Sequence, residues 1–160
     1  MKNVAIFAAV ASLTLATPAL ANNFTGVRAE ATVGLDDVTG PKPINRNDVK
    51  YGFGAGVDAE IYKNVIVGVE GNVDNVFDRR NIGVGARLGY VVTPNVMVYG
   101  KVGYANWKQT TSRELEGLRF GGGVEAKVSG PFYVKAEFRH THFDHRVGTN
   151  GGLLGVGVRF

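Results

Sequence analysis

All three histidines of the chain lie in the stretch RHTHFDHR, as His140, His142 and His145, with Asp144 beside the last. Imidazole and carboxylate groups are common ligands of transition metals. His142, Asp144 and His145 therefore form a candidate metal site, in what we expect to be the last long loop. The stretch sets no ligand geometry, and a solvated loop whose charge changes with pH is the simpler interpretation. We expect neither a bound metal nor another cofactor.

Charged residues offer a second candidate chemistry. Eight of them fall on one face of the expected strands, near mid-height: Glu30, Asp58, Glu70, Arg87, Lys101, Glu125, Lys135 and Glu137. Paired carboxylates can act as general acid and base, but no nucleophile, oxyanion hole or substrate cleft can be recognised beside them. We interpret these residues as a structural charge network and do not expect an enzyme.

The elements that must position these residues are strands. Apolar residues alternate with glycine and polar residues at the two-residue period of a strand with one apolar face. The alternating segments are 27–35, 50–61, 65–74, 82–90, 96–104, 118–128, 132–139 and 154–160. Most of them have the ~9–11 residues that a tilted strand needs to cross a bilayer. No segment keeps a helical period, so the chain is predicted to be all-β.

Short and long connections alternate along the chain. The tight turns are YKN at 62–64, VTPN at 92–95 and SGP at 129–131. The longer, polar connections are 36–49, 74–81, 106–117 and 141–151. This arrangement is typical of a bacterial outer-membrane barrel whose two termini lie on the periplasmic side. We predict an eight-stranded antiparallel up-and-down transmembrane β-barrel.

The period alone does not tell which face of the strands meets water. The polar face is crowded with glycine, which suits a narrow lumen that must fit other side chains. Aromatic residues gather at strand ends, as interfacial girdles require: Phe24, Tyr51, Phe53, Tyr90, Tyr104, Phe120, Phe132, Phe138 and Phe160. We therefore expect the apolar face to meet lipid. The alternative is a soluble periplasmic barrel with an apolar interior that binds a ligand, as in lipocalins.

In the lipid-facing arrangement the charges lie inside the barrel, where an unpaired charge is costly. We expect Glu70 to pair with Arg87 and Lys101 with Glu125, because each pair falls on adjacent strands. The charges expected nearer the ends are Arg28, Lys127, Arg139 and Arg159. The simplest interpretation is a lumen filled by salt bridges, and the alternative is a gated proton or ion path in which the pairs exchange partners. A wide porin is disfavoured, because an open aqueous channel needs about 16–18 strands.

The first 21 residues have the features of a cleaved secretory signal. Lys2 is followed by an apolar run, and Ala19 and Ala21 flank Leu20 in an A-x-A site. We expect residues 1–21 to be a signal peptide and residues 22–160 to be one barrel domain, in a protein exported to the outer membrane.

Composition excludes several other classes. The chain carries 18 basic and 14 acidic residues, with a formal net charge of +4 at pH 7, and contains no block of Lys or Arg. This mild excess gives no argument for nucleic-acid binding. The chain has no cysteine, so it can form no disulfide, thiolate metal site or cysteine nucleophile.

The sequence resembles the small OmpA-like and OmpX-like outer-membrane barrels, often labelled opacity-protein or porin-family β-barrel proteins. The resemblance extends over residues 22–160 and is carried by YGFGAGVDAEIYKNV, GARLGYVVTPNVMVYGKVGYA, GGGVEAKV, YVKAEFRHTHF and GVGVRF. It implies that Phe160, at the end of an alternating strand, is a signal read by the outer-membrane assembly machinery.

The resemblance also implies a Gram-negative outer-membrane protein that contributes to envelope integrity and meets the outside through four loops. The expected partners are outer-membrane lipids and lipopolysaccharide, and the barrel is expected to be a monomer. Basic loop residues could meet anionic headgroups; they are Arg46, Arg79, Arg80, Arg113 and Arg146. A narrow gated channel for ions or small solutes is the alternative function.

A lipid-A-modifying enzyme is a more distant alternative. Some small outer-membrane barrels are deacylases, with a His-x-Ser-Asn arrangement near the outer rim. Here the corresponding place reads His140, Thr141, His142 and Phe143. The serine nucleophile is missing, which argues against this chemistry.

Overall fold

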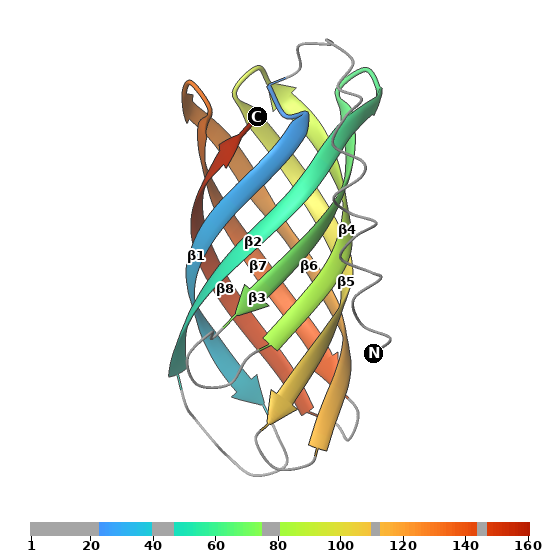
Figure 1. The fold of residues 1–160 in the computed structure, drawn as a ribbon, viewed down its shortest axis with the longest axis vertical. Helices are drawn as coiled ribbons and strands as arrows, with labels where there is room; N and C mark the ends of the chain where they lie inside the picture. Colours follow the sequence, from blue (N-terminus) through green and yellow to red (C-terminus); the bar gives the residue numbers. More distant parts are fainter. Residues whose placement is uncertain (1–22, 40–46, 75–80, 110–112, 144–146) are drawn as a thin grey trace, which may run out of the picture.

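The residues that the structure describes form one closed barrel of eight antiparallel strands (Figure 1). The structure is a computed structural model that describes residues 23–39, 47–74, 81–109, 113–143 and 147–160. The strands are β1 (Gly26–Thr39), β2 (Asn47–Tyr62), β3 (Val65–Asp74), β4 (Asn81–Thr93), β5 (Val96–Gln109), β6 (Arg113–Ser129), β7 (Phe132–Phe143) and β8 (Val147–Arg159). Each strand pairs with its neighbours in sequence, and β8 pairs with β1 to close the barrel. The fold predicted from the alternating segments is confirmed.

The strands turn their apolar side chains outward and their glycine and charged side chains inward. In β4, for example, Val84, Leu88 and Tyr90 are exposed while Arg87 is buried. An exterior with this many large apolar side chains must be covered by lipid or by another protein. The arrangement is the reverse of the soluble, lipocalin-like alternative, which is therefore wrong. The described residues include no helix long and apolar enough to span a membrane.

The tight turns and the C-terminus lie at one end of the barrel, the upper end in Figure 1. In the described chain these turns follow β2, β4 and β6, and each comes just after a register shift, at 60–62, 91–93 and 127–129. Asn64 and Gly130 have positive φ, 65° and 52°, as hairpin turns that contain a bulge often require. We call this end the turn end and the opposite one the loop end.

The strands extend further towards the loop end than the sequence predicts. Residues 36–39, 106–109 and 147–151 were expected in long connections but are paired strand residues. His142 likewise lies in β7, not in the last loop. These segments are polar at successive positions, so no alternation marks them, although backbone hydrogen bonding continues between neighbouring strands.

Leu154→Arg should destabilise the barrel, because it places a charge on the outer face midway along β8, where the leucine is 63% exposed. A basic residue at the middle of a lipid-facing surface costs about 2–4 kcal/mol of folding free energy, and about 0–1 kcal/mol near the interface. Tyr62→Arg, on the outer face at the turn end, is the matched control. The measurement is the urea concentration at which the folded band of unboiled samples disappears on a gel. Equal midpoints for the two variants would contradict a lipid-facing exterior.

Candidate functional site

The lumen of the barrel is filled by charged side chains. All eight residues of the set predicted from the sequence have buried side chains inside the barrel. Ion pairs join to them five further residues: Arg28, Asp74, Arg119, Arg139 and Arg159. Within the described part of the chain, Asn81 Oδ1 is the only buried side-chain nitrogen or oxygen without a hydrogen-bond partner. In the described chain the buried polar side-chain atoms are therefore almost all hydrogen-bonded, as the burial of charge requires.

Asp58 on β2 accepts hydrogen bonds from three guanidinium groups. Its Oδ2 lies 3.0 Å from Arg28 Nε, 2.6 Å from Arg87 Nη2 and 2.6 Å from Arg159 Nη1. Arg87 and Arg159 also donate to Glu125, which is fully buried. Side chains from β1, β2, β4, β6 and β8 thus meet at one point of the lumen.

Arg28 connects this cluster to the rest of the network. Its Nη1 lies 3.0 Å from Glu30 Oε2, and its Nη2 lies 2.6 Å from Glu70 Oε2. Lys101 Nζ in turn lies 2.6 Å from Glu70 Oε1 and 2.6 Å from Glu137 Oε1. Lysine and arginine therefore alternate with carboxylates across the lumen, and no carboxylate of this group depends on a single partner.

Two tyrosines belong to the network and were not singled out from the sequence. Tyr133 Oη donates to Glu30 (2.8 Å) and Tyr99 Oη donates to Glu137 (2.7 Å), and Lys135 bridges the same two carboxylates. Arginine guanidiniums lie over both tyrosine rings, 5.1 and 5.4 Å from the centroids. Both tyrosines occupy the glycine-rich face in the alternation, so the sequence did show that they point inward.

The observed pairing differs from the expected one. Glu70 and Arg87 were expected to pair with each other, but Glu70 is paired with Arg28 and Lys101, and Arg87 with Asp58 and Glu125. Lys101 and Glu125 were also expected to pair, but Lys101 is paired with Glu70 and Glu137, and Glu125 with Arg87 and Arg159. Cross-strand adjacency was the basis of that expectation. Inside a narrow barrel, long side chains also reach across the lumen, so facing strands compete with adjacent ones.

Three of the charges expected nearer the ends of the barrel are part of the network. Arg28 is fully buried at its centre, and Arg139 and Arg159 are paired with Glu137 and Asp58. The backbone position of an arginine near a strand end does not fix where its long side chain places the charge. Lys127 does lie at the turn end, where its Nζ is 2.6 Å from Asn23 Oδ1.

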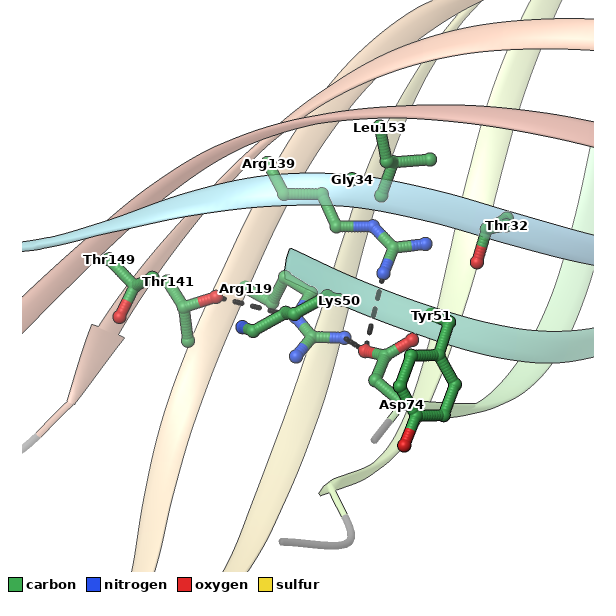
Figure 2. A pocket seen from close by; sticks show the side chains of 10 residues that line it. All are labelled: Thr32, Gly34, Lys50, Tyr51, Asp74, Arg119, Arg139, Thr141, Thr149 and Leu153. Carbon is green, nitrogen blue, oxygen red and sulfur yellow. Dashed lines mark hydrogen bonds and ion pairs between the residues drawn. The ribbon is translucent and has the colours of Figure 1, made fainter. Parts of the chain in front are cut away.

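The loop end of the network is looser than its centre (Figure 2). Asp74 Oδ2 lies 3.5 Å from Arg119 Nη1 and 3.4 Å from Arg139 Nη1, and Arg119 Nε lies 3.3 Å from Thr141 Oγ1. Figure 2 shows these side chains around a pocket of about 20 Å³ that Thr32 and other polar residues also line. This volume holds about one water molecule.

Glycines on neighbouring strands make room for the charged side chains. A Cβ at Gly68 on β3 would overlap Asp58 Oδ1, and a Cβ at Gly56 on β2 would lie 2.8 Å from Arg28 Nη2. Both glycines face the lumen, and their partners lie on the adjacent strand. The glycine-rich face is thus the complement of the charge network, because a narrow barrel cannot hold bulky side chains on every inward position.

The turn end of the lumen is apolar. Phe24 was expected in an aromatic girdle, but it is 1% exposed and packs with Ile66, Val91, Met97 and Tyr99. All five lie on the inward side of the barrel. The expectation was wrong because it used only the position of Phe24 near a strand end. Phe24 is an even number of residues away from the inward-pointing residues of β1, and this spacing indicates that its side chain points into the lumen.

The other aromatic residues proposed for the girdles are all exposed on the outer face: Tyr51, Phe53, Tyr90, Tyr104, Phe120, Phe132, Phe138 and Phe160. Tyr90, Phe132 and Phe160 lie at the turn end, and the others lie further from it. It remains a prediction that these residues form two aromatic girdles, one at each membrane interface.

The histidine-rich stretch lies at the loop end of β7. His140 and His142 point to the outer face, and His140 Nδ1 lies 2.7 Å from Asn150 Oδ1. Asp144 and His145 lie outside the described residues, as do Arg46, Arg79, Arg80 and Arg146. In the described ranges, no three His, Cys, Asp or Glu side chains are grouped as a metal ion requires.

The comparison with known families decides the identity of this barrel. A model of the outer membrane protein beta-barrel domain matches residues 5–160. The chain belongs to this family. The barrel therefore lies in the outer membrane of a Gram-negative bacterium. Barrels of this kind have short turns on the periplasmic side, so we expect the turn end, which holds the C-terminus, to face the periplasm.

Solved structures with a similar fold, and one relative by sequence, were found for this outer membrane protein beta-barrel domain. Ail, the attachment invasion locus protein of Yersinia pestis, has a TM-score of 0.59 and 17% identity, over 86% of this chain and all of Ail. The N-terminal barrel of Pseudomonas aeruginosa OprF has a TM-score of 0.54 and 16% identity, over 85% of this chain and 99% of that domain. Outer membrane protein A of Escherichia coli O157:H7 is 26% identical over 105 residues, which cover 57% of this chain and 30% of that protein. The chain thus spans about a third of the OmpA sequence.

Asp58→Asn should be strongly destabilising, because it removes the negative charge that three buried guanidiniums share. Removing one partner of a buried ion pair costs about 3–5 kcal/mol. The free energy of unfolding in urea, measured in lipid vesicles, is the test. Lys63→Gln, which neutralises an exposed charge in a tight turn, is the control and should change stability little. A loss no larger than that of the control would show that the network does not stabilise the barrel.

Gly68→Ala should destabilise the barrel and Gly152→Ala should not. A Cβ at Gly68 meets Asp58 and the backbone of β2, whereas a Cβ at Gly152, on the outer face, meets no atom within 4 Å. Overpacking of this kind costs about 1–3 kcal/mol. The same unfolding measurement compares the two variants. Equal stability would contradict the conclusion that the inward glycines make room for the charged side chains.

Proposed function

We propose that the protein is a structural and surface component of the outer membrane, whose lumen is a fixed, charge-filled core. The observation that carries this proposal is the continuous ion-pair network from Arg159 near the turn end to Arg119 near the loop end. Each of the eight strands contributes at least one charged residue to this network. A lumen filled in this way suits a stable barrel rather than a path for solutes through the membrane.

The dimensions of the lumen support the same conclusion. The pocket at the loop end has a volume of about 20 Å³, and at the turn end an apolar cluster lies in the lumen beside a cavity of about 190 Å³. An eight-stranded barrel has an interior just wide enough for its own side chains. We therefore propose that the resting protein is not an open pore.

The surface role is proposed for the loop end, which faces outward from the cell. Ail, which shares the fold, has been solved in complex with the heparin analogue sucrose octasulfate. Of the arginines that the sequence predicts in the long connections, Arg113 instead begins β6, and Arg46, Arg79, Arg80 and Arg146 lie outside the described residues. Basic residues of this kind suit an anionic partner, such as the phosphates of lipopolysaccharide. We propose anionic glycans and lipopolysaccharide as the partners of this end, and a monomer as the working unit.

Export and assembly are the remaining parts of the proposal. Residues 1–21 carry the signal peptide pattern, and Phe160 is 76% exposed at the end of β8, with its backbone bonded to Val27. A terminal aromatic side chain on the outer face is accessible to the assembly machinery before the last strand closes against β1.

A narrow, gated channel is the second candidate function. Lys101 lies 2.6 Å from both Glu70 and Glu137, so it can lose one carboxylate and keep the other. Such shared partners allow ion pairs to rearrange without leaving a charge unpaired. An enzymatic role has less support: Thr141 points into the lumen to Arg119, on the opposite face from the two histidines beside it.

Deletion of the gene should make the outer membrane more permeable to detergents and large antibiotics, and the wild-type gene should restore the barrier. Lys101→Gln separates the two candidate functions, because it leaves Glu70 and Glu137 with one cation fewer. If the role is structural, the folded variant should restore the barrier in proportion to its abundance and stay closed in planar bilayers. If the protein is a channel, the wild type should show discrete openings that the variant alters. An intact barrier in the deletion strain would contradict the structural role.

A further inference from the structure

The chain segment before β1 crosses the periplasmic mouth of the barrel. Gly26, with a φ of 107°, turns the chain at the start of β1, beside the backbone of Phe160. Asn23 Nδ2 then donates to the carbonyl oxygen of Pro94, 2.9 Å away in the β4–β5 turn. In a closed barrel of eight strands paired in sequence order, β1 and β5 lie on opposite walls. Residues Asn23–Thr25 therefore form a strap across the opening.

Phe24 is the part of the strap that enters the lumen. Its ring is 1% exposed and packs with Ile66, Val91, Met97 and Tyr99, from β3, β4 and β5. Directly behind this apolar layer lie the first charges of the lumen. Arg159, from β8, contacts both layers, because its Nη1 lies 2.8 Å from Phe24 O and 2.6 Å from Asp58 Oδ2.

Hydrogen bonds and the buried ring of Phe24 hold the strap, and its surroundings leave room. Its side-chain hydrogen bonds, from Asn23 to Pro94 and from Lys127 to Asn23, are both exposed to solvent, where each contributes little. A cavity of about 190 Å³ lies beside it, and its lining includes Thr25, Tyr133, Glu125 and Arg159. The buried ring and the hydrogen bond from Arg159 to the Phe24 carbonyl thus hold the middle of the strap, next to a space into which it can move.

We propose that Asn23–Thr25 is a gate on the periplasmic entrance of the lumen, with Phe24 as its removable plug. In the closed state the ring covers Ile66, Val91, Met97 and Tyr99 and separates the charges behind them from periplasmic water and small ions. When the strap swings out, water and small ions reach Arg87, whose guanidinium lies over the Tyr99 ring, and its partner Asp58. This gate goes beyond the proposed structural role, and it controls access to the lumen whether or not the lumen conducts from end to end.

The absence of cysteine from the chain permits a direct test by single-site labelling. Val91→Cys places a thiol of similar size behind Phe24, where the valine is 8% exposed. The purified, folded barrel in detergent is treated with a small cationic methanethiosulfonate reagent, and the labelling rate is measured by mass. We expect slow labelling with Phe24 intact and a rate at least about tenfold higher with Phe24→Ala, which corresponds to about 1.4 kcal/mol.

Three controls make the result specific to the plug. Phe132→Ala removes an exposed aromatic side chain at the same end and should leave the Val91→Cys rate unchanged. Ala105→Cys places a thiol at a buried inward position towards the loop end, and its rate should not respond to Phe24→Ala. Heat modifiability on a gel shows that each variant is folded, so the labelling result does not depend on the envelope phenotype of the deletion strain.

If Phe24→Ala does not fold, Asn23→Ala and Lys127→Ala test the gate by weakening the anchors of the strap with the ring in place. Each should raise the Val91→Cys labelling rate. Equal rates in the wild-type, Phe24→Ala and anchor backgrounds would overturn the proposal, and so would fast labelling with the strap intact.

Discussion

The burial of charge inside a narrow barrel is the constraint on which the rest of this structure depends. Asp58 shares its carboxylate among three arginines, and removing water from such groups is costly unless each charge finds partners. Closure of the sheet brings these partners together from strands far apart in sequence. The interior of the protein is therefore specified by charge pairing and the exterior by apolar side chains.

This constraint accounts for the composition of both faces. Long arginine, lysine and glutamate side chains need free volume, and glycine on neighbouring strands supplies it, as at Gly56 and Gly68. The outer face can be built from valine, leucine and aromatic residues because lipid covers it. A chain with a mean hydropathy near zero can thus belong in a membrane, since the average combines one polar and one apolar face.

The two ends of the lumen are built differently. The turn end contains an apolar cluster around Phe24, whereas the loop end has longer ion pairs around Asp74 and a small polar pocket. The charge network lies between the apolar cluster at one end of the lumen and the polar pocket at the other. In this arrangement, access to the same buried charges depends on different physical forces at each end: apolar packing on one side and ion pairing on the other.

The sequence by itself determined the strands, their faces and their order, because a two-residue period interrupted by alternating short and long connections has few other solutions. It also placed Glu30, Asp58 and Lys101 inside, since parity follows directly from position along a strand. It missed the strand residues towards the extracellular end, including His142, because backbone pairing there continues without an apolar face. Only the closed barrel decided which charges pair, why Arg28 lies at the centre, and that Phe24 plugs the mouth. The physical reason is that many of these contacts cross the lumen between strands that are not neighbours, and sequence periodicity contains no information about distance across a barrel.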